Sequence, residues 1–260
     1  MANPKISIIT ITYNSEKTVR ETFESVRRQH YDNLEYLIVD GGSTDSTLQI
    51  TEEYKDIITS CVSEKDNGIS DAMNKGIKRA TGDVIGIIHS DDMLAERALN
   101  RIAEAYDTKT DVYYGDLIVC AEEGKITHML KAKSDLSRMP YYVEMSHPST
   151  FIRKSSYEKY GLYDEKYRCV MDNDLLIRFY KKGAIFQYIS KPLAVYRVGG
   201  TNMKLRKVTI KESREIAIKY GGSRVIADYL YVKKTVSDKA KSLFGFLHSK
   251  RVIDINDEGK

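Results

Sequence analysis

The sequence predicts an α/β fold in which a mixed, mostly parallel sheet carries helices on both faces and is followed by a C-terminal helical tail. Short runs of β-branched and other apolar residues alternate with segments whose apolar residues recur at helical spacing. The strand-like runs are apolar at nearly every position, which is typical of parallel strands buried on both faces. With 42% hydrophobic residues, a chain of 260 residues can bury one substantial core of this kind.

The first two strands and the segments that follow them are the clearest elements. Four isoleucines within residues 6–11 predict a strand, and Asn14 and Ser15 form a cap for the helix that follows. Residues 36–39 predict a second strand, which ends in the sequence DGGSTD at residues 40–45. The two glycines allow a tight turn there, and the Ser, Thr and Asp residues favour the start of another helix.

The alternation continues to about residue 110 and then loosens. Strands are expected at residues 57–62 and 84–88, with a helix between them at 70–80 and another at 93–106. The later elements expected are strands at 112–114 and 117–119, a hairpin turn at 122–125, a helix at 172–182 and mainly helical structure from 207 onward.

Charge separates the tail from the rest of the chain. Residues 201–260 hold 14 Lys and Arg against 7 Asp and Glu, whereas residues 1–200 hold 27 against 30. The slightly acidic body argues against an extended nucleic-acid surface, and the basic tail could face an anionic membrane or be a solvated helix surface. We expect a main domain at residues 1–203, divided near residue 110, and a tail at 204–260.

Composition also indicates the compartment. The sequence has no uncharged apolar stretch of the length that a membrane-spanning helix needs, and its N-terminus lacks a basic region followed by an apolar core. We therefore expect a cytoplasmic protein. Cys61, Cys120 and Cys169 are too widely spaced to predict a disulfide framework or a zinc site, so we expect reduced thiols.

Polar side chains follow several of the predicted strands. Residues 12–14, Asp40, and the pair Asp91 and Asp92 each come at a strand end, and the carboxyl ends of parallel strands are where such sheets bind ligands. Adjacent carboxylates offer the oxygen ligands that a hard divalent cation bridging two phosphates needs. Taken alone, the pair is better explained as a cap for the helix expected at residues 93–106.

The pattern as a whole settles this choice. Five segments occur in order: TITYN at 10–14, VDGGSTD at 39–45, EKDNGISDAMNKG at 64–76, ATGD at 80–83 and SDD at 90–92. Together they resemble the large inverting family of nucleotide-sugar glycosyltransferases with the GT-A fold, particularly small bacterial members that build capsules, O-antigens and exopolysaccharides. The resemblance covers roughly residues 4–200. It implies a GT-A catalytic domain with a nucleotide-binding part at about 1–110 and an acceptor part at about 111–203.

The resemblance also implies roles for individual residues on the donor side. Those that it assigns to the nucleotide-sugar are Thr12, Tyr13, Asn14, Glu16, Asp40, Asp71, Asn74, Lys75, Ser90 and Asp91. Asp40 would hydrogen-bond the base, and Asp91 would reach the ribose. Asp92 would be the direct ligand of Mn²⁺ or Mg²⁺. Ser90 stands where the family often has an acid, which argues against Ser90 as a metal ligand and leaves Asp92 in place. Arg197, followed by GGTN at 199–202, resembles the segment that closes over the diphosphate, although an ordinary turn with a solvated Arg would look the same.

On the acceptor side the resemblance points to a general base. The sequence MDNDL at residues 171–175 resembles the family's acidic motif at the start of a helix, and Met171 stands where Glu is frequent. Asp172 is the expected base, with Asp174 as a competitor or supporting residue; the alternative is that Asp172 only caps the helix. His147 would lie on the acceptor side, and a structural role explains it equally well.

The tail carries an amphipathic pattern. Apolar residues recur at helical intervals through residues 225–236 and again at 243–247, beside several lysines. Packing on the core or in a homodimer is the expected role of this stripe, and docking on a membrane surface is the alternative.

Taken together, the sequence predicts a metal-dependent inverting glycosyltransferase that moves a hexosyl or N-acetylhexosaminyl group from a nucleotide-sugar, in the first instance a UDP-sugar, to a glycan or lipid-linked acceptor. One rival is a sugar-nucleotide-synthesising nucleotidyltransferase, disfavoured because a Gly-rich, basic phosphate loop is missing near the N-terminus. The other is a catalytically idle subunit that binds a nucleotide-sugar, which the missing acid at Met171 makes conceivable.

Overall fold

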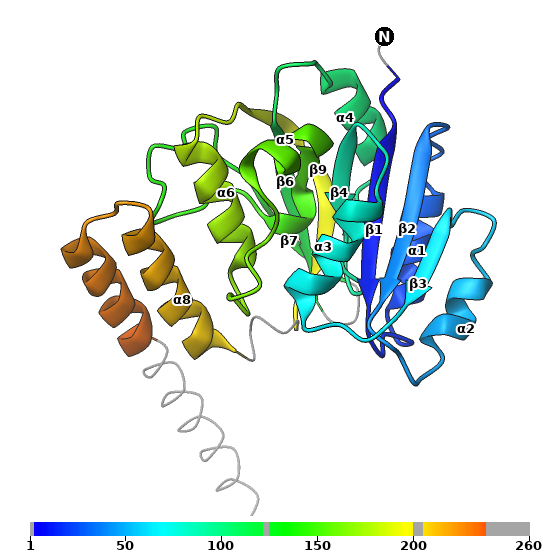
Figure 1. Ribbon diagram of the computed structural model, residues 1–260, viewed down its shortest axis with the longest axis horizontal. Helices are drawn as coiled ribbons and strands as arrows, with labels where there is room; N and C mark the ends of the chain where they lie inside the picture. The colour runs from blue at the N-terminus through cyan, green and yellow to red at the C-terminus, as the bar shows by residue number, and fades with distance from the viewer. Residues whose placement is uncertain (1–2, 122–124, 200–204, 238–260) are drawn as a thin grey trace, which may run out of the picture.

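The computed structural model describes residues 3–121, 125–199 and 205–237 (Figure 1). The tip of the expected hairpin at 122–125, most of the GGTN segment and the apolar residues at 243–247 lie outside this part of the chain. Figure 1 shows a central twisted sheet flanked by helices, with two C-terminal helices against one side.

All the strands belong to one mixed sheet, in the order β3-β2-β1-β4-β8-β6-β9-β5, with β7 paired to β6. The strands are β1 (Ile6–Thr12), β2 (Leu34–Asp40), β3 (Ser60–Ser63), β4 (Val84–Ile87), β5 (Met93–Leu94), β6 (Val112–Cys120), β7 (Ile126–Leu130), β8 (Thr150–Arg153) and β9 (Phe186–Arg197). The first four pair in parallel, and β8 joins β4 to β6 through antiparallel pairings. The predicted mixed sheet is confirmed.

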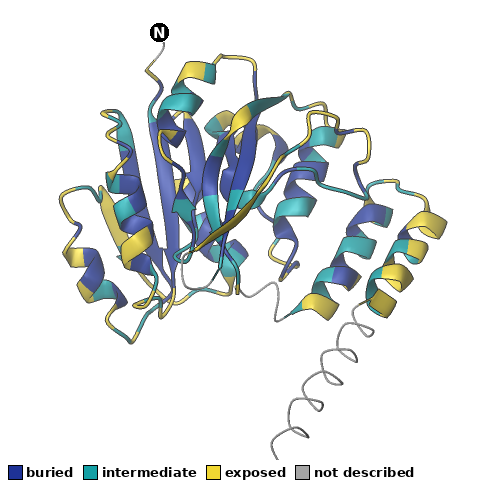
Figure 2. Cartoon of the chain, turned by 180° about the vertical axis from the view of Figure 1, so that it is seen from behind, coloured by how far each residue is buried: buried dark blue, intermediate teal, exposed yellow. Residues whose placement is uncertain are grey.

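Helices cover both faces of the sheet. They are α1 (Val19–Arg27), α2 (Thr47–Glu52), α3 (Ile69–Arg79), α4 (Ala98–Ala105), the 3-10 turn η1 (His147–Ser149), α5 (Lys154–Tyr160), α6 (Met171–Lys181) and α8 (Arg206–Lys219). Residues 224–237 form a further helix. In β1, Ile6 and Ile8 pack towards α1 and α4, whereas Ile9 and Ile11 pack towards α3 and α6. Because alternate side chains enter opposite cores, the strand has no polar face, as its sequence predicted. Figure 2 shows the central strands buried and the edge strand β3 exposed.

Two elements differ from the sequence prediction because sheet pairing overrides local pattern. Residues 93–106 were expected to be one helix, but Met93 and Leu94 pair with β9 and the helix begins only at Ala98, after Arg97 with its φ of 57°. The strand expected at 57–62 begins at Ser60, where pairing with Leu37 of β2 begins. Ile57 and Ile58 instead pack against the core from the preceding loop.

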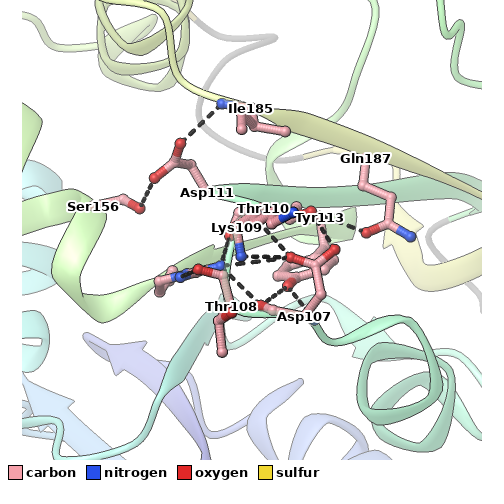
Figure 3. A network of polar contacts seen from close by, with 10 residues as sticks. Asp107, Thr108, Lys109, Thr110, Asp111, Tyr113, Ser156, Ile185 and Gln187 are labelled. Atoms are coloured by element: carbon pink, nitrogen blue, oxygen red, sulfur yellow. Dashed lines mark hydrogen bonds and ion pairs between the residues drawn. The ribbon is translucent and has the colours of Figure 1, made fainter.

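A polar network fixes the amino-terminal end of β6, at the end of the sheet opposite the polar strand ends (Figure 3). Arg153 donates to the carbonyl oxygens of Asp107, Thr108 and Thr110. The Asp111 carboxylate accepts from Ser156 Oγ at 2.6 Å and from the Ile185 amide at 2.9 Å. These contacts satisfy most of the polar groups at this end, although Nε of Arg153 is buried and finds no hydrogen-bond partner among the described residues.

The C-terminal helices are present, as predicted. Among the described residues, none of the helices is long and apolar enough to span a bilayer. Helix α8 contacts α6, and Ile216 joins the buried core on that face of the sheet.

Candidate active site

A cavity of about 690 Å³ opens at the carboxyl ends of β1, β3 and β4. Nine residues predicted for the site line it: Thr12, Tyr13, Asn14, Glu16, Ser90, Asp91, Asp92, His147 and Asp172. The other six predicted residues are described by the structure but are not among those that line this cavity: Asp40, Asp71, Asn74, Lys75, Asp174 and Arg197. The strand ends therefore meet at one cavity, but several of the polar side chains near them do not line it.

Asp40 lies beneath the site and serves the backbone around it. Its side chain is fully buried, and it accepts hydrogen bonds from the side chains of Thr12, Ser43 and Ser63 and from the amides of Gly42 and Ser43. Burial alone would raise the pKa of Asp40, but these hydrogen bonds outweigh it and hold the pKa below its usual value. The carboxylate is thus ionised and its oxygens are occupied by the protein itself.

Residues of α3 fasten neighbouring loops. Asn74 forms two hydrogen bonds of 3.0 Å with the backbone of Tyr163, one donated by Nδ2 and one accepted by Oδ1. Asp71 accepts from the amide of Asn67 at 2.9 Å and pairs with Lys75 at 3.3 Å. In this arrangement Asn74 holds the 163 loop against α3, and Asp71 holds the loop that precedes the helix.

His89, Asp91 and Asp92 can together hold a metal ion. Each offers one ligand atom, and these atoms lie within 4.8 Å of one another. Burial, and then the neighbouring Asp91, raise the pKa of Asp92 to about 8. Burial and the nearby His147 lower the pKa of His89 to about 4, so its imidazole is neutral at pH 7, the form that binds metals. Nε2 of His89 is buried and finds no hydrogen-bond partner among the described residues. Two crowded carboxylates and an unsatisfied nitrogen are what a divalent cation would relieve.

Arg197, at the end of β9, lies behind this cluster. Its amide donates to Asp92 Oδ1 at 3.1 Å, its Nε approaches the Asp91 carbonyl at 3.4 Å, and its guanidinium pairs with Glu21. Arg197 is 7% exposed. In this structure it therefore supports the Asp91–Asp92 turn from the side away from the cavity.

Asp172 faces the cavity from the first turn of α6. Burial raises its pKa to about 6, against the effect of the Asn173 amide, which donates to Oδ1 at 2.9 Å. His147 also lines the cavity; its ring lies 4.9 Å from that of His89 and its Nε2 lies 3.2 Å from the Tyr163 hydroxyl. Burial lowers the pKa of His147 to about 4. At neutral pH the cavity thus contains an ionisable carboxylate with raised basicity between uncharged neighbours.

Asp174, two residues further along α6, is fully buried and is not among the residues that line the cavity. Its Oδ1 accepts from Lys219 Nζ at 2.8 Å and from the Tyr220 hydroxyl at 2.9 Å. Asp174 is therefore an anchor between α6 and the C-terminal part of the chain.

Sequence reasoning missed several residues that line the cavity, among them Asp45, Asp66 and His89. Asp66 accepts from the Gly68 amide at 2.9 Å and lies so close to Gly41 that a Cβ there would collide with it. The signal for His89 was its place directly before Ser90 at a strand end. Asp45 and Asp66 belong to the quoted segments, but nothing in residue type alone distinguished them from the anchoring Asp40 and Asp71.

Comparison with known proteins decides the family. Residues 7–161 match the model of the family described as Glycosyl transferase family 2. The chain belongs to this family. It is 30% identical over 207 residues to a PGL/p-HBAD biosynthesis glycosyltransferase of Mycobacterium bovis, which covers 77% of this chain and 79% of that relative. It is 26% identical to EpsE of Bacillus subtilis, over 97% of this chain and 96% of the relative.

Solved structures agree on the fold. S. aureus TarS 1-349 in complex with UDP-GlcNAc gives a TM-score of 0.66 at 20% identity, over 89% of this chain and 71% of that one. The mannosyltransferase PcManGT from Pyrobaculum calidifontis, in complex with GDP-Man and Mn²⁺, gives 0.67 at 16% identity, over 99% and 82%. The GT-A-like fold and the glycosyltransferase class predicted from the sequence are confirmed, and the family favours transfer over nucleotide-sugar synthesis.

The buried position of Asp40 predicts an effect on stability. Replacing Asp40→Asn puts an NH₂ group against hydroxyl and amide donors, so we expect the free energy of unfolding to fall by about 1–3 kcal/mol at pH 7. Urea unfolding measures this, with Asp66→Asn as the matched control, expected within about 0.5 kcal/mol.

The same measurement at low pH checks the cause. Because the folded pKa of Asp40 is depressed, its contribution is fully present above the unfolded value of about 4 and is lost as the pH falls through the folded value. The difference between wild type and Asp40→Asn should therefore shrink below about pH 4. A difference that stays constant down to pH 3 would contradict the assignment.

Proposed function

We propose that the protein transfers a sugar from a nucleoside-diphosphate sugar, in the first instance a UDP-sugar, to a hydroxyl of a glycan or lipid-linked glycan, with inversion. The observation that carries the proposal is that one cavity is lined both by the cluster of His89, Asp91 and Asp92 and by the half-buried carboxylate of Asp172. TarS and PcManGT, whose folds this chain shares, are described with UDP-GlcNAc and with GDP-Man and Mn²⁺. The mycobacterial relative is named as a glycosyltransferase of PGL/p-HBAD biosynthesis, which supports a role in a biosynthetic sugar transfer.

The residues divide the chemistry between the two sides of the cavity. On the donor side, Thr12, Tyr13 and Asn14 would hold the nucleotide, and the exposed ring of Tyr13 would stack on the base. His89, Asp91 and Asp92 would hold Mn²⁺ or Mg²⁺, and the bound cation would neutralise charge on the departing diphosphate. A nitrogen ligand would favour Mn²⁺ over Mg²⁺.

On the acceptor side, Asp172 would act as the general base. It takes the proton of the acceptor hydroxyl as that oxygen bonds to the anomeric carbon, and the bond from that carbon to the diphosphate breaks on the opposite face. Its raised pKa makes it a stronger base than an exposed aspartate while leaving it mainly ionised at pH 7. His147 lies beside it, uncharged, as part of the acceptor wall.

The first prediction of the proposed function concerns donor binding. Titration calorimetry with UDP-, GDP- and dTDP-sugars, with and without Mn²⁺, should show Mn²⁺-dependent binding of one nucleotide class. Asp92→Ala should weaken that binding at least 10-fold, because it removes a metal ligand, whereas the matched variant Asp172→Asn should retain it.

Two results would count against the proposal. If no nucleotide-sugar binds and Mn²⁺ changes nothing, the donor site is refuted. If binding occurs without turnover with any acceptor or with water, the idle binding subunit becomes the better reading.

The second prediction concerns pH. Since Asp172 acts in its ionised form and its pKa is about 6, kcat at saturating donor and Mn²⁺ should rise with pH and level off above pH 7. Saturating Mn²⁺ keeps Asp92 ionised, and the pKa values of His89 and His147 are about 4, well below the pH range in which kcat is expected to rise. Asp172→Asn should lower kcat by about 10²-fold or more. A rate that is flat from pH 5 to 8 would exclude Asp172 as the base.

We also propose that the final described helix rests on an anionic membrane surface. Val225, Tyr229, Val232 and Val236 recur on one face of residues 224–237 and are 78%, 61%, 56% and 59% exposed (Figure 2). The surplus of Lys and Arg in residues 201–260 supports this surface.

The third prediction is therefore that wild-type protein sediments with liposomes containing anionic lipid, and not with neutral ones. The double variant Tyr229→Asp/Val232→Asp should lose this binding, whereas Ile126→Asp, at an equally exposed apolar residue of β7, should keep it. Unchanged binding by the double variant would contradict the proposal. If the wild type is a dimer and the double variant is a monomer, this face instead binds a second copy of the chain.

A further inference from the structure

Helix α8 contacts α6 at two points, one in the backbone that leads into α6 and one in its first turn. The residues involved lie outside the segment that the family model matches. The first contact is Glu212, which is 8% exposed. Its Oε1 accepts from the amide of Arg168 at 2.9 Å, and its Oε2 accepts from those of Cys169 and Val170 at 3.0 and 3.3 Å. One buried carboxylate thus orders the backbone that leads into α6.

The second contact lies at Asp174, two residues beyond the predicted base. Lys219 Nζ donates to Asp174 at 2.8 Å, and the adjacent Tyr220 hydroxyl donates to the same oxygen. Glu212 and Lys219 are seven residues apart, so they lie on one face of α8, two turns from each other. Asp172 lies in the chain between the segment held by Glu212 and the residue held by Lys219.

We infer that Glu212 and Lys219 are positioning residues for transfer, because they fix the helix turn that presents Asp172 to the cavity. The inference rests on the proposed function. Cys169, within the held backbone, and Met171, directly after it, also line the cavity, so movement of this segment would change the site directly. A shift of about 1 Å in a reacting group can cost 10²-fold in rate, which makes the hold on this turn relevant to catalysis as well as to stability.

Glu212 does more than fill space, because its carboxylate accepts hydrogen bonds from three backbone amides. The amides of residues 168–170 precede α6 and have no helical acceptors, and the carboxylate supplies both of its oxygens to them. An amide side chain at this position would turn an NH₂ group towards the same donors. Removing the charge while keeping the shape therefore tests the contact with little change in packing.

The experiment compares Glu212→Gln with Glu215→Gln, a matched change on the same helix at a residue that pairs with Lys211 at 3.9 Å. Hydrogen–deuterium exchange should be at least 10-fold faster at the amides of residues 168–170 in Glu212→Gln and unchanged at β4. UDP release from the UDP-sugar that the wild type turns over should show kcat lowered about 10-fold or more, with KM for that donor within about 2-fold. Glu215→Gln should match the wild type in all three measurements.

A second pair of variants tests the other contact. Lys219→Met should lower kcat without changing donor KM, and Lys219→Arg, which retains a donor to Asp174, should restore most of it.

The outcomes separate the two claims. Faster exchange at residues 168–170 with wild-type kcat would overturn the positioning role and leave α8 as a structural support. A wild-type protein that releases no UDP from any UDP-sugar, with the exchange pattern as expected, would instead overturn the proposed function on which the inference rests.

Discussion

The buried carboxylate of Asp40 ties three strand ends together, and the geometry of the cavity depends on that tie. Thr12 at the end of β1 and Ser63 at the end of β3 both donate to it, and its own loop folds back through the amides of Gly42 and Ser43. An ion with no formal partner is costly inside a protein unless several donors face it. The surrounding hydroxyls and amides meet that cost, and the parallel register of Thr12 with Asp40 is thereby fixed.

Above this anchor, the site concentrates charge of one sign. Acidic residues that line the cavity are Glu16, Asp45, Asp66, Asp91, Asp92 and Asp172, against a single cationic side chain among the described lining residues, Lys17. Such a surface would repel a diphosphate on its own. Part of this imbalance is felt by Asp92, whose pKa is raised by burial and then by the neighbouring Asp91. On the proposed function, a divalent cation at the His89 cluster would make the local charge favourable for a diphosphate, while leaving Asp172 anionic enough to accept a proton.

Much of this arrangement could be predicted from the sequence, because strand runs buried on both faces and polar strand ends follow directly from pattern. What could not be predicted is the direction in which each polar side chain points. Asp40 and Asp92 look alike in the sequence, yet the hydroxyls supplied by Thr12, Ser43 and Ser63 make one an internal anchor. Asn74 is likewise used by the backbone of Tyr163, which lies 89 residues away in the chain. Such partners are set by tertiary packing, and the same packing turned Met93 and Leu94 from an expected helix into a strand.

The C-terminal part of the chain is therefore more than a basic appendage. Residues from 205 to 220 bury apolar side chains in the core. They also supply the Glu212 carboxylate, which binds the backbone leading into α6, and the Lys219 ammonium group, which binds Asp174 in its first turn. The start of α6 therefore depends on α8 for its hydrogen bonds. Asp174 shows this dependence on α8. It belongs to the expected acidic motif, but it pairs with Lys219 and does not line the cavity. The acidic motif thus combines two functions within three residues, Asp172 facing the cavity and Asp174 holding the element that carries it. The position of Asp172 is thereby coupled to the helix that leads into the final, apolar-faced segment.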